Sequence, residues 1–249
     1  MKNTPVRVEV LGVPLDCVNM DQALDFVDEF IAKDKKGTII AVNPEKIIKA
    51  NDDENLLKLL NNSSLLIPDG IGAVLGAKLL NNVSLSRVPG AELMPHICQR
   101  AVLKKYRIFL LGAAPDVNAK AVEKLKNDYP GVNIVGSRDG YFEDDEIPNL
   151  INDINISQAN ILFIALGSPG QEIWMDKYIE ELNVNICQGV GGTFDVLAGN
   201  VKRAPAFFRS INLEWLYRLL AQPSRFLRQT ALPKYVVLVL KEWLRAKIN

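Results

Sequence analysis

Four polar side chains lie in short, turn-like segments where they could bind a substrate or move a proton. Asp69 and Asn43 each follow an apolar run, and they precede a glycine and a proline. Gln171 and Asp195 lie in two glycine-rich segments. A carboxylate held beside a substrate can act as a general base, which typically accelerates a reaction about 10²–10⁴-fold. Asp69, in its Asp-Gly turn after an apolar run, is a carboxylate of this kind. The alternative is that Asp69, Asn43 and Gln171 cap helices.

The sequence excludes several common kinds of site. Neither G-x-G-x-x-G after the first apolar run nor the phosphate-binding G-x-x-x-x-G-K-[ST] is present. The three cysteines are far apart and His96 is the single histidine, which excludes a zinc or redox motif and a disulfide framework. No Asp-x-Asp stands among apolar residues, and the acidic runs 52–54 and 143–146 are typical of helix starts. We expect no metal, no cofactor, and buried cysteines.

Apolar runs and helical patterns alternate along the chain. They predict strands at residues 6–11, 38–42, 65–67, 107–111, 132–135, 161–166 and 184–187. They predict helices at 20–33, from 44 onward, and at 71–80, 91–104, 116–128, 147–154 and 171–182. This order predicts an α/β fold: a Rossmann-like, mostly parallel sheet with helices on both faces.

Six small or polar loops follow the predicted strands. They comprise residues 43–45, 68–70, 112–115, 138–140, 167–172 and 189–195. Each loop by itself could be an ordinary turn. In open parallel sheets, however, ligands lie beyond the carboxyl ends of the strands. The six loops together therefore predict a ligand cleft at one edge of the sheet.

The last fifty residues differ from the rest of the chain. Residues 200–249 carry ten Lys and Arg and two Glu, a net charge of +8, whereas residues 1–199 carry −8. They also hold seven of the eighteen aromatic residues, and from about residue 207 they have a helical pattern with breaks near Pro223 and Pro233. We expect an α/β catalytic core at 1–199 and a C-terminal helical appendage at 200–249. The appendage could bind an anionic membrane surface or an acidic ligand, or could simply be a helical layer packed on the core.

The composition limits where the protein acts and what it binds. Basic and acidic residues are equal in number, at 29 each, so nothing indicates a nucleic-acid partner. No apolar run reaches the roughly 18 residues of a membrane span, and the first residues lack the pattern of a signal peptide. These features predict a cytoplasmic protein. The sequence leaves open whether it forms a homo-oligomer.

Five segments, in order along nearly the whole chain, resemble the WecG/TagA/CpsF family of bacterial glycosyltransferases, and the TagA branch most of all. They are Asn-Pro-Glu at 43–45, Pro-Asp-Gly-Ile-Gly at 68–72 with Arg-Val-Pro-Gly at 87–90, Gly-Ser-Pro-Gly-Gln-Glu at 167–172, the glycine-rich 189–195, and Arg-Ala-Pro at 203–205 followed by Glu-Trp-Leu-Tyr-Arg at 214–218. The resemblance implies an inverting transfer of N-acetylmannosamine from a UDP-sugar to a lipid-diphosphate-linked GlcNAc. It places this reaction, a step in wall teichoic acid synthesis, at the inner face of the cell membrane, without a bound metal.

The resemblance also implies roles for particular residues. Asp69 is the expected base, and Arg218, Arg225 and Arg228 are the expected cations that offset the charge of the departing diphosphate. The expected donor contacts are Asn43, Arg87, Gln171 and Asp195. Arginine suits such a task because its planar guanidinium group binds phosphate oxygens through two parallel hydrogen bonds.

One position departs from the family pattern, which has threonine two residues before the asparagine of Asn-Pro-Glu. Here that residue is Ala41, which cannot donate a hydrogen bond. The donor sugar could therefore differ, as in relatives that serve capsule or enterobacterial antigen synthesis. The chain could also be a membrane-peripheral binder of nucleotide sugars without turnover. A Rossmann-like oxidoreductase would share the fold, but the missing glycine fingerprint argues against it.

Overall fold

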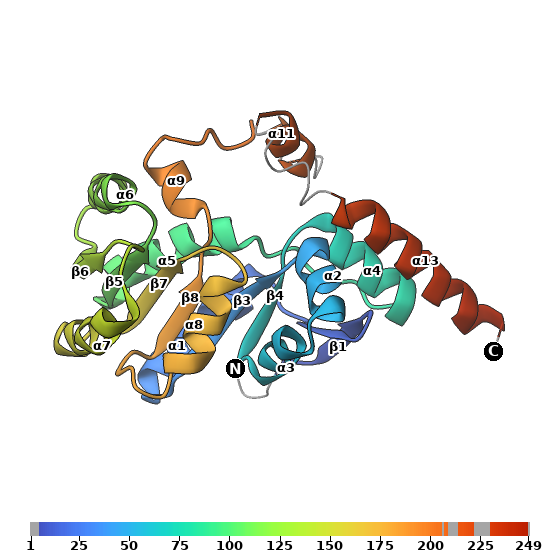
Figure 1. Ribbon diagram of the computed structural model, residues 1–249, viewed down its shortest axis with the longest axis horizontal. Helices are drawn as coiled ribbons and strands as arrows, with labels where there is room; N and C mark the ends of the chain where they lie inside the picture. Colours follow the sequence, from blue (N-terminus) through green and yellow to red (C-terminus); the bar gives the residue numbers. More distant parts are fainter. Residues whose placement is uncertain (1–4, 206, 209–213, 222–229, 249) are drawn as a thin grey trace.

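The computed structural model describes residues 5–205, 207–208, 214–221 and 230–248. Six parallel strands form its main sheet in the order β4-β3-β8-β7-β5-β6, as Figure 1 shows. Their bounds are β3 Gly37–Val42, β4 Leu65–Pro68, β5 Arg107–Gly112, β6 Asn133–Arg138, β7 Ile161–Ala165 and β8 Ile186–Gly189. The predicted α/β fold with a parallel sheet is confirmed.

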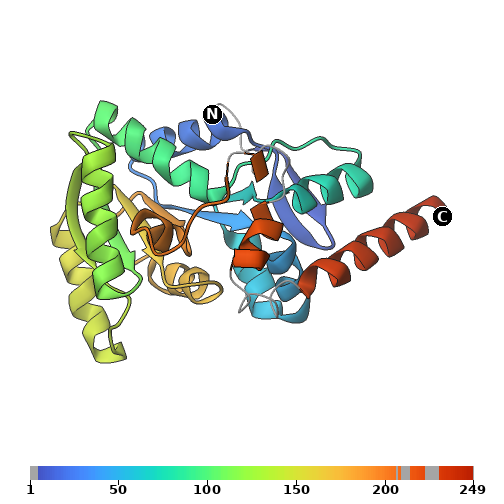
Figure 2. The same ribbon diagram turned by 90° about the horizontal axis from the view of Figure 1, so that it is seen from above.

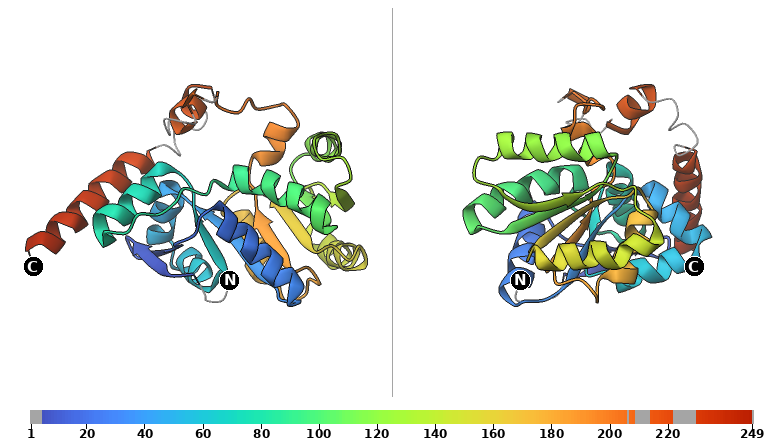
Figure 3. Two further views of the ribbon diagram at one scale, coloured as in Figure 1. Left: turned by 180° about the vertical axis from the view of Figure 1, so that it is seen from behind. Right: turned by 60° about the vertical axis from the view of Figure 1, so that its left-hand side comes forward.

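Helices cover both faces of this sheet, which the right-hand view of Figure 3 shows nearly edge-on. On one face the strand residues pack against α1 Met20–Ala32, α5 Gly90–Lys104 and α6 Pro115–Asp128. On the other they pack against α2 Pro44–Asp52, α3 Glu54–Asn62, α7 Ile147–Ile156 and α8 Gly170–Tyr178. Neighbouring residues such as Ile39 and Ile40 join opposite cores because side chains alternate along a strand.

The predicted first strand is wrong in extent, because the chain forms a hairpin there. β1 Arg7–Val10 pairs antiparallel with β2 Val13–Asp16, outside the main sheet. The turn residues Leu11 and Gly12 have positive φ angles of 51° and 77°, as in the tight turns that suit hairpins. Leucine rarely adopts that conformation, so its presence gave no signal of a turn.

The acidic run at 52–54 starts a helix as predicted. The Asp53 side chain accepts hydrogen bonds from the backbone N–H groups of Asn55 and Leu56 in the first turn of α3. The run at 143–146 contains a short 3₁₀ helix, Asp144–Glu146, that leads into α7. Both acidic runs therefore serve local structure.

The C-terminal part contains α9 Thr193–Leu197, α11 Glu214–Ala221 and α13 Ala231–Ile248. α13 packs on α2 and on α4 Ile71–Asn81, and Figures 1 and 3 show it alongside α4. Tyr235 and Val239 of α13 belong to the buried core on that side of the sheet. Pro233 lies in the first turn of α13, where its missing N–H is tolerated, and Pro223 lies outside the described residues. None of the described helices is long and apolar enough to cross a membrane.

Candidate active site

All six predicted loops lie at one edge of the sheet. Each follows the carboxyl end of one of the six parallel strands, so the expected gathering of loops is present. α2, α4, α6, α8 and α9 begin in these loops. α9 and α11 lie above the sheet in Figure 1, and α11 faces the viewer in Figure 2. The carboxyl edge is therefore the candidate active site.

Two backbone hydrogen bonds bring Asn43, Asp69 and Arg87 to the same place. The N–H of Asp69 donates to the carbonyl of Val42 over 2.9 Å, which joins the ends of β3 and β4. The N–H of Val88 donates to the carbonyl of Pro68 over 2.8 Å, so the loop carrying Arg87 lies beside the end of β4. Asp69, which is half-buried, thus lies at the same strand ends as two other predicted substrate contacts.

Asn43 acts as a helix cap, which was the alternative role for this residue. Its side-chain oxygen accepts from the backbone N–H of Lys46 over 2.9 Å at the start of α2. By contrast, neither Asp69 nor Gln171 stands at a cap position, because α4 follows Gly70 and α8 follows Pro169 without a side-chain cap. Capping therefore does not explain Asp69 or Gln171.

Gln171 is buried, with 5% of its surface exposed. Its side-chain amide donates to Glu172 over 2.9 Å and accepts from the backbone N–H of Gly191 over 3.0 Å. Glu172 in turn forms a buried ion pair with Lys46 of α2. Gln171 therefore links the loops that follow β7 and β8, and only one N–H of its amide remains to contact a donor.

Arg87 belongs to a charged cluster at the start of α5. A terminal nitrogen of Arg87 lies 3.9 Å from Glu92 Oε1, and a terminal nitrogen of Arg203 lies 2.7 Å from the same oxygen. The Nε–H of Arg203 is buried without a hydrogen-bond partner among the described residues. One carboxylate cannot neutralise two guanidinium groups, so this cluster has a net positive charge.

The remaining predicted site residues are less closely gathered. Asp195 is half-buried in the first turn of α9, a helix that packs against α6. Arg218 belongs to α11, whereas Arg225 and Arg228 lie outside the described residues. Ala41 packs close to the start of α5, because a Cβ atom on Gly90 would lie 3.2 Å from the Ala41 methyl group.

Histidine and cysteine side chains, which often form metal or nucleophilic sites, are not among the residues gathered at the candidate site. His96 is exposed on α5, and its Nδ1 lies 2.7 Å from the carbonyl oxygen of Glu92. Cys98 and Cys187 are buried as predicted, and burial raises the pKa of each thiol to about 12, whereas Cys17 is only partly buried. Across the described part of the chain, no three His, Cys, Asp or Glu residues group in a way that could hold a metal ion.

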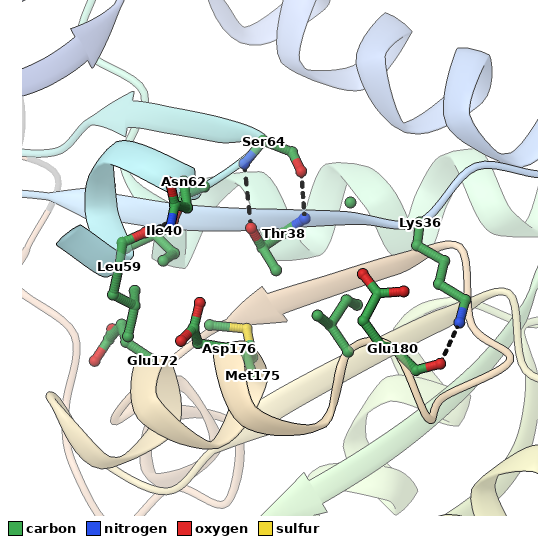
Figure 4. Close-up of a pocket in the computed structure, with 13 residues that line it drawn as sticks. Lys36, Thr38, Ile40, Leu59, Asn62, Ser64, Glu172, Met175, Asp176 and Glu180 are labelled. Atoms are coloured by element: carbon green, nitrogen blue, oxygen red, sulfur yellow. Dashed lines mark hydrogen bonds between the residues drawn. The ribbon is translucent and has the colours of Figure 1, made fainter. Parts of the chain in front are cut away.

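The pocket in Figure 4 does not coincide with the carboxyl edge. It has a volume of about 130 Å³ and lies between α3, α8 and the amino ends of β3 and β4. There Thr38 and Ser64 exchange two hydrogen bonds of 3.2 Å through their backbone N–H groups and side-chain oxygens. Among its lining residues, Glu172 also contacts the candidate site.

Four further residues of the site, Lys46, Glu92, Glu172 and Arg203, were not predicted as site residues from the sequence. Lys46 and Glu92 each lie in the first turn of a helix that begins beside a predicted site residue, which was a usable signal. Their partners are distant in sequence, however: Lys46 and Glu172 are 126 residues apart, and Glu92 and Arg203 are 111 apart. Only the tertiary structure pairs them.

Comparison with known proteins agrees with the resemblance found in the sequence. The family model described as "Glycosyl transferase WecG/TagA/CpsF family" matches residues 8–249. A Bacillus spizizenii protein is 38% identical over 230 residues, which cover 88% of this chain and 89% of that protein. A Bacillus subtilis protein is 37% identical over 232 residues, covering 93% and 90%. Both are named N-acetylglucosaminyldiphosphoundecaprenol N-acetyl-beta-D-mannosaminyltransferase. The chain belongs to the WecG/TagA/CpsF family of glycosyl transferases.

Proposed function

We propose that this protein transfers N-acetylmannosamine from its UDP derivative to undecaprenyl-diphosphate-linked GlcNAc, a step in building the linkage unit of wall teichoic acid. The names of both relatives contain this acceptor and this sugar. The structural observation that supports the proposal most is the placement of Asn43, Asp69 and Arg87 by the hydrogen bonds of Asp69 to Val42 and of Val88 to Pro68. These bonds place a carboxylate, an amide and a cation at one edge.

The proposed reaction is a single displacement at the anomeric carbon of the donor. Asp69 removes the proton from the acceptor hydroxyl, and the acceptor oxygen forms a bond to the anomeric carbon. The bond from that carbon to the UDP oxygen breaks at the same time, so the configuration inverts. UDP leaves with the electron pair, and Asp69 keeps the proton. A base positioned in this way contributes about 10²–10⁴-fold.

The negative charge that develops on UDP requires cations. Arg87 and Arg203 both lie close to the Glu92 carboxylate, and the cluster of these three residues has a net positive charge. α4 and α5 begin at the same edge without a side-chain cap, so their first backbone N–H groups also favour an anion. Arg218, Arg225 and Arg228 are the further cations of this proposal.

We further propose that the protein is peripheral on the inner face of the cell membrane, where its lipid-linked acceptor would lie. α13 supports this, because its outward residues Val236, Val237, Leu240 and Leu244 are 45–62% exposed. At spacings of one, four and eight residues they share one face of the helix. Lys241, Arg245 and Lys247 are exposed on the same helix. Each such cation near an anionic surface contributes about 1 kcal/mol.

A transfer assay with radiolabelled donors and a lipid-linked GlcNAc acceptor tests the activity. We expect transfer from UDP-N-acetylmannosamine. No transfer from any UDP-sugar, with donor binding retained, would instead favour a non-catalytic binder.

Ala41 favours one other candidate function, the use of a related UDP-sugar. Ala41→Thr is the matched variant, because it restores the family's hydroxyl group, and a donor preference that shifts on this change would support that second candidate.

Binding to vesicles tests the membrane role separately. Val237→Asp together with Leu240→Asp places charge on the outward face of α13 without changing the buried residues Tyr235 and Val239. We expect weaker binding to vesicles that contain anionic lipid, with unchanged thermal stability. Wild-type binding by this variant would contradict the membrane role and would leave the proposed transfer reaction untouched.

A further inference from the structure

A buried ion pair lies directly beneath the candidate site. Lys46 Nζ lies 2.5 Å from Glu172 Oε1, and the two side chains are only 7% and 0% exposed. Removing two charges from water is costly, and an apolar pair of similar volume often stabilises a fold equally well or better. Stability is therefore a weak explanation for this pair, and the geometry that it imposes is a better one.

The ion pair is the centre of a continuous chain of contacts. On one side, the backbone N–H of Lys46 donates to the side chain of Asn43. On the other side, Glu172 Oε1 accepts from the Gln171 amide over 2.9 Å, and that amide accepts from Gly191 N–H. The chain therefore joins the loops that follow β3, β7 and β8. Its ends include both amide side chains expected to contact the donor.

The orientation of Gln171 is determined within narrow limits. A Cβ atom on Gly189 would lie 2.5 Å from Gln171 Nε2, so the amide packs directly on the end of β8. Glu172 Oε2 has no hydrogen-bond partner among the described residues, so Oε1 makes the contacts to both Lys46 and Gln171. Loss of Glu172 would remove the ion pair to Lys46 and the hydrogen bond to Gln171 at the same time.

We propose that Lys46 and Glu172 are positioning residues for the donor, which act by holding Asn43 and Gln171 in place. Their burial keeps them from touching the substrate. The inference rests on the proposed function, in which Asn43 and Gln171 contact the UDP-sugar.

The test replaces both charges at once. Lys46→Met alone and Glu172→Leu alone each leave an unpaired buried charge and should lower the melting temperature. The double variant removes that penalty and should regain most of the stability. We expect its affinity for UDP-N-acetylmannosamine, measured by calorimetry, to remain about tenfold weaker, equal to about 1.4 kcal/mol. In the transfer assay, the KM for the donor should rise while kcat changes less.

A second ion pair provides the control. Arg7 Nε lies 2.8 Å from Asp16 Oδ1, and Asp16 is 1% exposed, but this pair joins the hairpin to the β4 side of the sheet and hydrogen-bonds to none of the site residues that the structure describes. Arg7→Met with Asp16→Leu should leave donor affinity unchanged. If the Lys46→Met/Glu172→Leu variant does not fold, Lys46→Met/Glu172→Met replaces it, because methionine adapts to irregular spaces.

Two results distinguish a failure of this inference from a failure of the proposed function. A stable double variant with wild-type donor affinity and KM would overturn the positioning role alone. Absence of UDP-sugar binding by the wild-type protein would overturn the proposed function and, with it, the inference.

Discussion

Substituting Gly76 by alanine should weaken the docking of α13. A Cβ atom at Gly76 would lie 2.1 Å from Tyr235 Oη and 2.9 Å from Val10 Cγ1. Tyr235 is 4% exposed, and its hydroxyl donates to the carbonyl of Gly72 over 2.9 Å. Burial raises the pKa of this phenol, which keeps it a neutral donor. To accept the extra methyl group, α13 and α4 must move apart by about 1 Å.

The sign of the effect distinguishes tight docking from loose docking. Alanine in place of a helical glycine normally stabilises by about 0.5–1 kcal/mol. Overpacking a core costs about 1–3 kcal/mol, so the net loss should be up to about 2.5 kcal/mol. In a chain of this size, that loss lowers the melting temperature by up to about 10 °C. Because α4 begins two residues after Asp69, we also expect slower transfer.

Thermal unfolding of four proteins tests this reasoning: the wild type, Gly76→Ala, Tyr235→Phe and the double variant. Tyr235→Phe removes the hydroxyl, so the nearest ring atom, Cζ, would lie 3.2 Å from the new methyl group. Gly76→Ala should then cost less in the phenylalanine background than in the wild type, which is the signature of a direct contact. A melting temperature that rises in Gly76→Ala, or an equal cost in both backgrounds, would refute the proposed docking.

Three further predictions concern the catalytic base, the independence of transfer from metal ions, and the pH dependence of stability. Asp69→Asn should lower transfer at least about 100-fold with UDP-sugar affinity by calorimetry unchanged, and near-normal turnover would remove Asp69 from the role of base. Transfer should persist after thorough EDTA treatment because arginines offset the diphosphate charge; a rate that stops and returns only with Mg²⁺ or Mn²⁺ would contradict this. Burial raises the pKa of Cys98 and Cys187 from 9.0 to about 12, so the unfolded thiols ionise first and native stability should fall as pH rises through this range. Melting temperatures measured from pH 8 to 11 check this, and a flat profile would count against it.

The arrangement of the site could be predicted because few topologies fit the order of elements. Strands that alternate with helices form a parallel sheet, and all carboxyl ends then lie at one edge. Asn43 and Asp69 follow neighbouring strands, so their proximity follows from this rule. The family motifs added Arg87, which no periodicity in the sequence would have selected.

Other features depend on contacts between distant residues. No local sequence pattern pairs Lys46 with Glu172 or Arg203 with Glu92. The two partners of each ion pair lie in segments that are far apart in the sequence. The hairpin turn at Leu11 was missed for a different reason, since its positive φ angle is uncommon for leucine.

The C-terminal region best illustrates which features the sequence determined and which only the tertiary structure decided. The basic and aromatic composition of residues 200–249 by itself indicated a region different from the rest, because charge and residue type can be counted without coordinates. Composition could not indicate which face of α13 is buried, because apolar residues lie on both sides. Only the tertiary structure decided that Tyr235 and Val239 pack on α2 and α4 while Val236, Val237 and Leu240 stay exposed. The physical reason is that Gly76 leaves room on α4 for the Tyr235 side chain, a complementarity between two helices some 160 residues apart in the sequence.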